Sequence, residues 1–290
     1  MDWIREINWN EQAFKSLVID ESMKELIQAL VSSHLSAEKG TDLIPNKGNG
    51  LVILLHGSPG TGKTFTVESV AEVAKKPIYP ITCGNIGTNP DLAEKYLDSV
   101  LHLGKIWNCI ILLDEAEVFL EQRSLNDLKR NALVSVFLRA LEYYEGILIL
   151  TTNRVGTLDE AFKSRIQLAL QYDNPMEHQR KQIWRNFFQN LRDLEEEKNI
   201  DFDDIMLNMD DLSGYPMNGR QIRNSITSAR KLARFRQKKM TFTHLRHAIT
   251  MAEKFDGYLA SVRESDVEAS SQRVNGRLSD DYIARVNQIR

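Results

Sequence analysis

The chain has 290 residues, 42% of them hydrophobic, and a formal net charge of −3. This length and apolar content allow a buried core and suit one large and one small domain. The weak charge excludes a global field that would draw the chain onto nucleic acid, and no apolar run approaches the roughly 18 residues of a membrane-spanning helix.

Residues 1–50 are expected to form an entry segment, and their start lacks the pattern of a signal peptide. An amphipathic helix is predicted from Glu21 to His34, before a glycine-containing linker. The two cysteines, Cys83 and Cys109, lie in or beside later strands, which favours buried free thiols over a disulfide or a zinc site. We therefore expect a soluble, intracellular protein.

A glycine-rich motif follows the first predicted strand, residues 51–55. It is Gly57-Ser58-Pro59-Gly60-Thr61-Gly62-Lys63-Thr64, which fits G-x-x-x-x-G-K-[ST] without a mismatch. Apolar residues at helical spacing continue from Phe65 to Ala74, so strand, loop and helix have the order of a phosphate-binding loop. In such a loop, backbone N–H groups bind phosphate, Lys63 reaches the β- and γ-phosphates and the Thr64 hydroxyl binds Mg²⁺. The alternative is a turn that binds no ligand.

A second apolar run, residues 109–113, ends in Asp114 and Glu115. Carboxylates at the C-terminal end of a central parallel strand lie in the crevice where such sheets bind ligands. We therefore expect Asp114 to hold the magnesium shell, usually through water, and Glu115 to orient and polarise the attacking water. The alternative is an acidic helix start, because both residue types also suit a first helical turn.

A third apolar run, residues 147–151, is followed by Thr152, Asn153 and Arg154. Asn153 is placed to hydrogen-bond the attacking water or the γ-phosphate. The alternative is an asparagine that caps the next turn.

Five strand candidates alternate with helical patterns over residues 51–173. They are 51–55, 78–82, 109–113, 147–151 and a weaker one at 166–171. This alternation predicts an α/β fold, an αβα sandwich of the P-loop NTPase type with a mainly parallel sheet. A long helix is expected over residues 126–144 within it.

A small all-helical lid domain is predicted over residues 174–255. Its first helix is expected to begin at Asn174-Pro175, with the proline in the first helical position. Its core is expected to contain Ile183, Trp184, Phe187, Phe188 and Leu191.

The basic residues between Arg220 and Lys239 are interpreted as a solvated helix face with nucleotide-facing arginines, and nucleic-acid binding is the alternative. The last helix is expected from His244 to Phe255. Residues 256–290 are predicted to be a polar tail that is either disordered or binds a partner.

The chain resembles the AAA+ ATPases and is close to the AAA clade. GSPGTGKT is similar to the Walker A motif of that family, ILLDEAEVF to its Walker B motif, and ILILTTNRVGTLDEAFKSRI to the stretch from the first sensor to the arginine finger. The resemblance covers roughly residues 10–255. Residues 107–165 are most similar to the ATPase module of large fungal AAA proteins.

The resemblance implies further roles. Asn153 falls on the first sensor, and Arg165 on the arginine finger that reaches the γ-phosphate bound to a neighbouring subunit. Arg154 is a second candidate contact, and Arg220 resembles a second-sensor arginine. A planar, permanently charged guanidinium stabilises the transferring phosphoryl group. The alternative for each arginine is a solvated or salt-bridged surface residue.

Three departures from the family pattern stand out. The clade has paired arginines after Pro-Gly where this chain has only Arg165, and it usually lacks the second-sensor arginine that Arg220 supplies. The loop that lines the central pore of peptide-threading relatives carries an aromatic residue, an aliphatic residue and glycine. Here Asn85, Ile86 and Gly87 occupy these positions, and an amide grips a translocating chain less well than a ring.

We therefore predict an ATPase with the cofactors ATP and Mg²⁺. The catalytic residues are expected to be Lys63, Glu115, Asn153 and Arg165, with Thr64 and Asp114 as the metal ligands. The residues expected to bind the nucleotide are Gly57, Ser58, Pro59, Gly60, Thr61, Gly62, Lys63, Thr64, Phe65, Asp114 and Arg220.

The chain is expected to self-associate into a ring, a hexamer, when ATP is bound. This ring is expected to remodel an unknown protein partner. The alternatives are a motor or loader stimulated by nucleic acid and a slow nucleotide-dependent switch or scaffold. A small-molecule kinase shares the phosphate-binding loop, but Arg165 and the helical lid argue against it.

Overall fold

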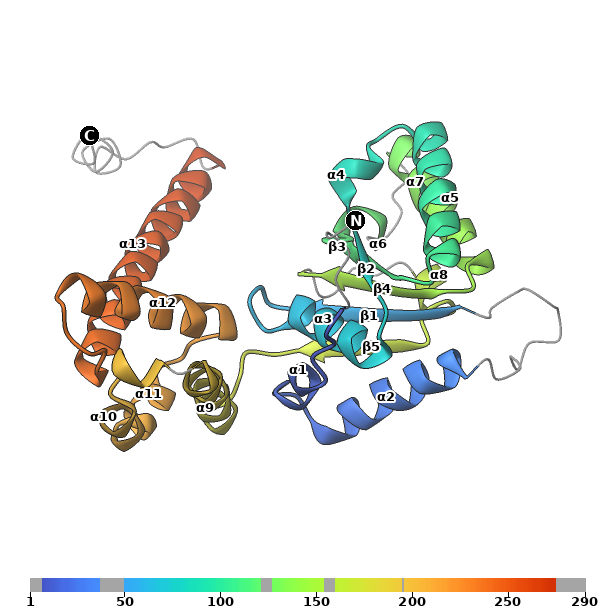
Figure 1. Cartoon of the computed structure of the whole chain (residues 1–290). Coiled ribbons are helices and arrows are strands. Elements are labelled where there is room, and N and C mark those ends of the chain that lie inside the picture. Colours follow the sequence, from blue (N-terminus) through green and yellow to red (C-terminus); the bar gives the residue numbers. More distant parts are fainter. Residues whose placement is uncertain (1–6, 37–49, 121–126, 154–159, 195, 275–290) are drawn as a thin grey trace. The chain divides into compact units, whose positions relative to one another are not determined.

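The computed structural model describes residues 7–36, 50–120, 127–153, 160–194 and 196–274 (Figure 1). The chain divides into two compact units. The first contains the residues up to Asn186 together with Pro216–Arg220, and the second contains Phe187–Tyr215 and the chain from Gln221 onward. The expected division between core and lid at residues 173 and 174 stays a prediction.

The first unit is built on a five-stranded sheet in which every pairing is parallel, in the order β2-β3-β4-β1-β5. The strands are β1 (Leu51–Gly57), β2 (Ile78–Thr82), β3 (Ile110–Asp114), β4 (Ile147–Thr152) and β5 (Leu168–Tyr172). Each lies within two residues of its expected position, and β1, β3 and β4 are short, buried apolar runs. The predicted α/β fold with a mainly parallel sheet is confirmed.

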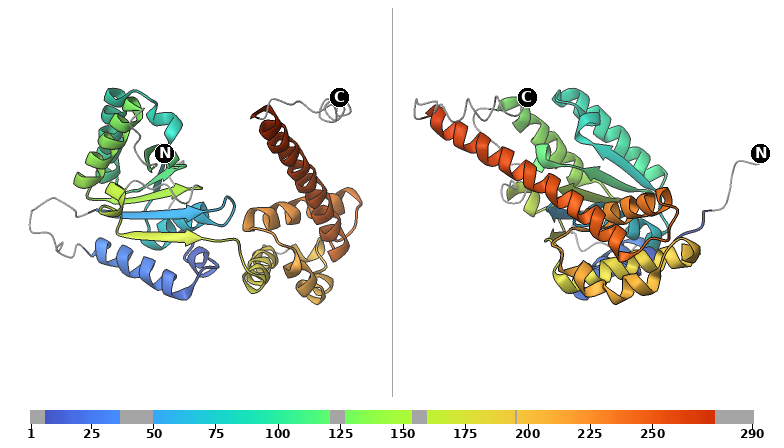
Figure 2. Two further views of the ribbon diagram at one scale, coloured as in Figure 1. Left: turned by 180° about the vertical axis from the view of Figure 1, so that it is seen from behind. Right: turned by 90° about the vertical axis from the view of Figure 1, so that its left-hand side faces the viewer.

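Helices cover both faces of the sheet, as Figures 1 and 2 show. One face carries α1 (Gln12–Lys15), α2 (Glu21–Leu35) and α3 (Lys63–Ala74), and the other carries α4 (Cys83–Ile86), α5 (Pro90–Ile106), α6 (Glu117–Leu120), α7 (Leu128–Tyr143) and α8 (Glu160–Lys163). Strand side chains alternate between the layers: Ile53 and Leu55 join the first core, and Val52 and Leu54 the second.

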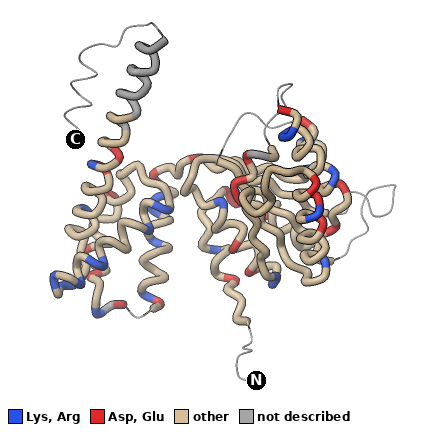
Figure 3. The backbone as a smooth tube through the Cα atoms, turned by 90° about the horizontal axis from the view of Figure 1, so that it is seen from above, with Lys and Arg blue, Asp and Glu red and all other residues tan. Residues whose placement is uncertain are grey.

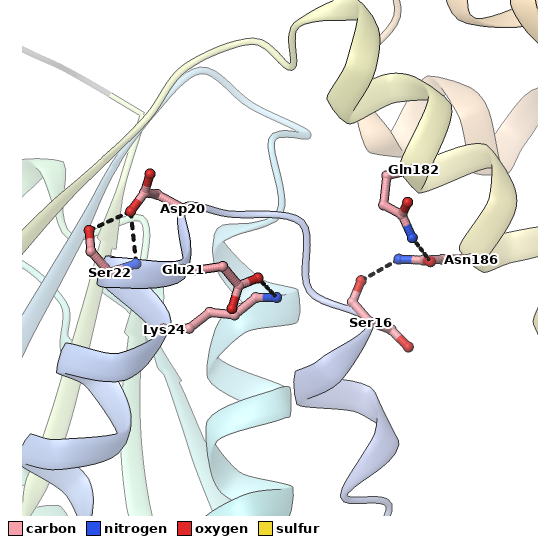
Figure 4. Close-up of polar contacts among 7 residues, drawn as sticks. All are labelled: Ser16, Asp20, Glu21, Ser22, Lys24, Gln182 and Asn186. Carbon is pink, nitrogen blue, oxygen red and sulfur yellow. Dashed lines mark hydrogen bonds and ion pairs between the residues drawn. The ribbon is translucent and has the colours of Figure 1, made fainter.

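The entry segment belongs to the first unit, and Figure 4 shows polar contacts within it and with Asn186. Asp20 caps α2 by accepting a hydrogen bond from the Ser22 N–H at 2.8 Å, and the Ser22 hydroxyl and N–H lower the pKa of the Asp20 carboxyl. At the end of α1, the Ser16 carbonyl accepts a hydrogen bond of 2.7 Å from Asn186 Nδ2. Gln182 in turn donates to Asn186 Oδ1 at 2.8 Å, which orients that amide.

Helix α9 (Glu177–Asp193) begins two residues later than expected, so Pro175 is not its first helical residue. The Gln179 side chain accepts a hydrogen bond of 2.8 Å from the Met176 N–H, which is half of a capping box and makes Met176 the cap. The Pro175 carbonyl accepts a bond of 2.8 Å from Arg180, so it is satisfied outside the helix.

The second unit contains the end of α9 and further helices. These are η1 (Glu196–Lys198), α10 (Phe202–Leu207), α11 (Met209–Gly214), α12 (Gly219–Phe235), whose first two residues belong to the first unit, and α13 (Phe242–Val274). Phe188 and Phe202 pack edge to face with their ring centres 6.5 Å apart. Of the expected lid core, Trp184, Phe188 and Leu191 are buried, whereas Ile183 and Phe187 are only half-buried.

Helix α13 is longer than expected, because it continues past Phe255 to Val274. Among the residues of α13 whose exposure is described, Ile249 is the last buried apolar one, and the side chains from Met251 to Tyr258 are exposed. The expectation followed apolar periodicity, which weakens in this region, but helix-forming residues keep the backbone helical beyond it. None of the helices in the described part of the chain combines the length and apolar character that a bilayer span requires.

The basic residues of α12 lie on the side opposite its buried stripe, which contains Ile222, Ile226 and Ala229. Arg223, Lys231 and Arg234 are exposed. Figure 3 colours the lysines and arginines of the whole described chain blue. Arg230 contacts Glu196 in an ion pair of 2.5 Å. This distribution is that of an amphipathic helix with a solvated face.

Candidate nucleotide-binding site

The glycine-rich loop connects β1 to α3 at the carboxyl edge of the sheet. Gly57, Gly60 and Gly62 have φ angles of 142°, 80° and 109°, which only glycine adopts readily. A Cβ atom on Gly57 would lie 2.0 Å from the Tyr172 carbonyl oxygen, whereas one on Gly62 would meet nothing within 4 Å. Gly57 therefore permits close packing against β5, and Gly62 opens the space in front of α3.

The start of α3 has the features of an anion site. Its cap, Gly62, supplies no side-chain hydrogen bond, so the N–H groups of Lys63, Thr64 and Phe65 receive no acceptor from a capping side chain. These groups and the helix dipole place partial positive charge at this end. Thr64 is half-buried and Phe65 is 41% exposed, so both lie at the surface of the site.

The Lys63 side chain is buried and folds over the loop. Its Nζ donates hydrogen bonds to the carbonyl oxygens of Gly57 at 2.7 Å and Ser58 at 2.8 Å. Burial lowers the pKa of Lys63, the carboxylates of Asp114 and Glu117 oppose this shift, and the Arg220 cation adds to it. The ammonium group is therefore within electrostatic range of these three groups.

A hydroxyl pair fixes α3 to the sheet behind the loop. Thr66 Oγ1 and the Tyr172 hydroxyl are 2.7 Å apart, and burial raises the pKa of Tyr172 to about 12. Within the loop, the Thr61 hydroxyl donates to the Ser58 carbonyl at 2.8 Å. These bonds hold the loop and the helix start in one arrangement.

The segment Pro216–Arg220 lies against the loop within the same unit. Asn218 Nδ2 donates to the Pro59 carbonyl at 3.3 Å, and the Arg220 N–H donates to the Gly60 carbonyl at 3.4 Å. A Cβ on Gly60 would lie 2.7 Å from Asn218 Oδ1. Arg220 is thus within electrostatic range of Lys63, and its role as a nucleotide-facing arginine stays a prediction. Sequence reasoning assigned no role to Asn218, and the only signal for one was its position two residues before Arg220.

The acidic pair ends β3 before α6 begins at Glu117. The Thr151 hydroxyl donates to Asp114 Oδ1, and the Glu115 N–H donates to Thr151 Oγ1 at 3.2 Å. Glu115 has a left-handed φ of 56°, which costs a non-glycine residue about 1–2 kcal/mol. Its side chain is exposed, so the carboxylate is accessible at the strand end.

Asn153 lies at the end of β4, the strand between β1 and β3. Its N–H donates to Glu117 Oε1 at 2.7 Å, and its side chain is exposed. The sequence had assigned no role to Glu117, although it follows Asp114 and Glu115 in the same acidic motif. Arg154 falls outside the described residues.

The Arg165 guanidinium is bound within its own chain, close to α7 and α8. One terminal nitrogen donates to the Ala161 carbonyl at 2.9 Å, and the other contacts Glu142 of α7 at 3.1 Å. Both side chains of the ion pair are 27% exposed. The Arg165 Nε atom is buried and has no hydrogen-bond partner among the described residues.

The short helix α4 contains the residues that correspond to a pore loop. Asn85 Oδ1 accepts hydrogen bonds from the Thr82 N–H at 3.2 Å and from the Thr82 hydroxyl at 2.6 Å. Ile86 is 3% exposed and packs in the core. The amide is therefore occupied in capping its own turn, and the aliphatic side chain faces inward.

These features define the P-loop NTPase class: a parallel sheet, a glycine-rich loop between β1 and α3, and an acidic pair at the end of β3. Residues 53–174 match the family model described as ATPase family associated with various cellular activities (AAA), and residues 176–266 match the fungal AAA+ ATPase lid domain. The chain belongs to the AAA family of ATPases, which confirms the resemblance seen in the sequence.

Curated relatives are similar at low identity. The chain is 24% identical over 194 residues to human ATPase family AAA domain-containing protein 3B, covering 62% of this chain and 28% of that protein. It is 28% identical over 189 residues to the outer mitochondrial transmembrane helix translocase of Danio rerio, covering 62% and 48%. It is 26% identical over 147 residues to a putative 26S proteasome regulatory subunit homolog of Methanothermobacter thermautotrophicus, covering 48% and 40%. The chain thus spans less than half the length of each relative.

Proposed function

We propose that this protein is a Mg²⁺-dependent ATPase whose turnover drives rearrangement of a macromolecular partner. The observation that carries this proposal is the convergence at one sheet edge of Lys63, whose pKa responds to Asp114, with the acidic pair that ends β3. A cationic side chain beside a carboxylate pair matches the needs of phosphoryl transfer to water.

The residues present fit a triphosphate and a magnesium ion. The space in front of Gly62 and the start of α3 suit phosphate oxygens, and the Thr64 hydroxyl and Asp114 carboxylate are oxygen ligands of the kind Mg²⁺ prefers. No group of three or more His, Cys, Asp or Glu among the described residues forms a metal site by itself. The ion would therefore bind together with the phosphates, whose developing charge it would neutralise.

Each residue has a distinct part in the proposed reaction. Lys63 and the loop N–H groups hold the β- and γ-phosphates, while Glu115 accepts a hydrogen bond from the attacking water and aligns it. Asn153 orients the water or the γ-phosphate from the neighbouring strand end. Arg165 completes the site of an adjacent subunit, so full activity requires a ring, which we propose to be a hexamer.

Replacing Lys63 with alanine tests the nucleotide site. We expect Mg-ATP binding to weaken by about tenfold or more, since a charge-assisted hydrogen bond contributes about 1.5–3 kcal/mol. Calorimetry would measure the affinity, and hydrolysis by the wild type should stop in excess EDTA. Lys95→Ala, an exposed lysine on α5, is the control and should bind normally. Unchanged affinity in folded Lys63→Ala protein would refute the proposed site.

The contacts of α4 favour a second candidate, a nucleotide-dependent switch or scaffold. Asn85 and Ile86 are engaged within the chain and provide no gripping side chain like the aromatic of threading machines. One relative is named as a transmembrane helix translocase, and this similarity supports a polypeptide partner instead. An unfolded polypeptide should stimulate ATP hydrolysis severalfold if the protein remodels chains. ATP-dependent association without stimulation would identify the switch.

A further inference from the structure

The backbone of Glu115 is held from both sides in its left-handed conformation. On one side, Thr151 Oγ1 accepts a hydrogen bond from the Glu115 N–H, and the Thr151 carbonyl accepts one of 2.8 Å from the Ala116 N–H. On the other side, the Cys83 thiol donates to the Glu115 carbonyl at 2.8 Å. A φ of 56° at a residue with a side chain persists only where surrounding contacts impose it.

Cys83 is itself held in a fixed place. It follows Thr82, the last residue of β2, which pairs in register with Asp114. The Asn85 side chain closes the turn on Thr82, and Ile86 anchors the turn in the core. The backbone of Cys83 is therefore fixed by the strand end and by the core, which keeps its thiol within reach of the Glu115 carbonyl.

We propose that Cys83 is a positioning residue for the water-orienting glutamate, an inference that rests on the proposed ATPase function. The peptide group between Glu115 and Ala116 is held at both ends, its N–H by the Thr151 carbonyl and its C=O by the Cys83 thiol, so the thiol helps to fix the rotation of this group. This rotation influences the direction in which the Glu115 side chain points away from the backbone. Thr151 fixes the preceding peptide group, so the two contacts together determine the orientation of the catalytic carboxylate.

Two substitutions of Cys83 separate the hydrogen bond from packing. Cys83→Ala removes the donor, and we expect turnover at saturating Mg-ATP to fall about tenfold while the nucleotide dissociation constant stays within about twofold. Cys83→Ser keeps a donor within reach of the carbonyl and should retain at least about half of the wild-type turnover. The control is Cys109→Ala, which makes the same chemical change just before β3, at the end of that strand away from Glu115. It should leave turnover within about twofold.

A double variant tests whether Cys83 acts through Glu115. In single-turnover measurements, adding Cys83→Ala to Glu115→Gln should cause less than about a twofold further loss, because the group being positioned is already disabled. An equal tenfold loss in both backgrounds would overturn the proposal, as would full activity of Cys83→Ala. These failures differ from failure of the proposed function, in which Glu115→Gln itself would turn over normally.

Discussion

Replacing Glu115 with glutamine should leave Mg-ATP bound and slow its hydrolysis at least tenfold, with a reduction near a hundredfold expected. A positioned general base contributes about 10²- to 10⁴-fold, and an amide of the same shape cannot accept the proton of the attacking water. Because Glu115 is exposed at the strand end and Lys63 holds the loop, the substitution leaves the phosphate contacts intact. Phosphate release would measure turnover, and calorimetry would measure binding.

Glu68→Gln is the matched control for this result, because it makes the same chemical change at an exposed position on α3. It should hydrolyse ATP at the wild-type rate. If Glu115→Gln also does so, Glu115 is not the group that orients the water. If Glu115→Gln fails to bind nucleotide, its side chain has a structural role in the site instead.

The arrangement of this sheet edge was predictable from the sequence because parallel strands end together. The central strands β1, β3 and β4 are each built on an apolar run, so they could be located without the structure, and the polar residues after them had to meet at one edge. The glycine-rich motif then predicted which edge residues would contact phosphate. The family resemblance added Arg165 and Arg220, which local pattern alone does not distinguish from surface arginines.

Contacts between residues far apart in the chain were not predictable in this way. The bonds from Cys83 to Glu115, from Asn218 to Pro59 and from Arg165 to Glu142 depend on tertiary packing, and no spacing in the sequence encodes them. Two helix ends were predicted wrongly for local reasons. At the start of α9, side-chain capping by Gln179 outweighed the signal of the proline. At the end of α13, helix propensity outweighed the loss of apolar periodicity.

Arg165→Ala should reduce ATP hydrolysis by about 10³-fold while nucleotide binding stays within about twofold. Arginine fingers contribute about 10³- to 10⁵-fold by stabilising charge on the transferring phosphoryl group, and they act only when presented to the bound nucleotide. The hydrogen bonds described for Arg165 go to Ala161, Ser164 and Glu142 of its own chain, and a role at a neighbouring subunit is the proposal that this variant tests. ATPase assays over a range of protein concentrations, with light scattering to measure assembly, would test this.

Arg139→Ala is the control for loss of an ion pair, because Arg139 contacts Glu94 at 3.1 Å from the same helix that carries Glu142. This pair is more exposed, so its removal should change stability by less than about 1 kcal/mol and leave turnover unchanged. Thermal unfolding of Arg165→Ala would show whether loss of the Glu142 contact destabilises the fold and so accounts for lost activity.

Mixing two inactive variants gives the sharpest test of a shared site. Arg165→Ala subunits keep an intact Glu115, and Glu115→Gln subunits keep an intact Arg165, so a mixed ring contains interfaces with both groups present. Activity should therefore return on mixing, in proportion to the fraction of such interfaces. Two outcomes would refute a finger acting between subunits: no recovery in rings shown to contain both variants, or full wild-type turnover by monomeric protein. Recovery would establish that one chain completes the site of the next.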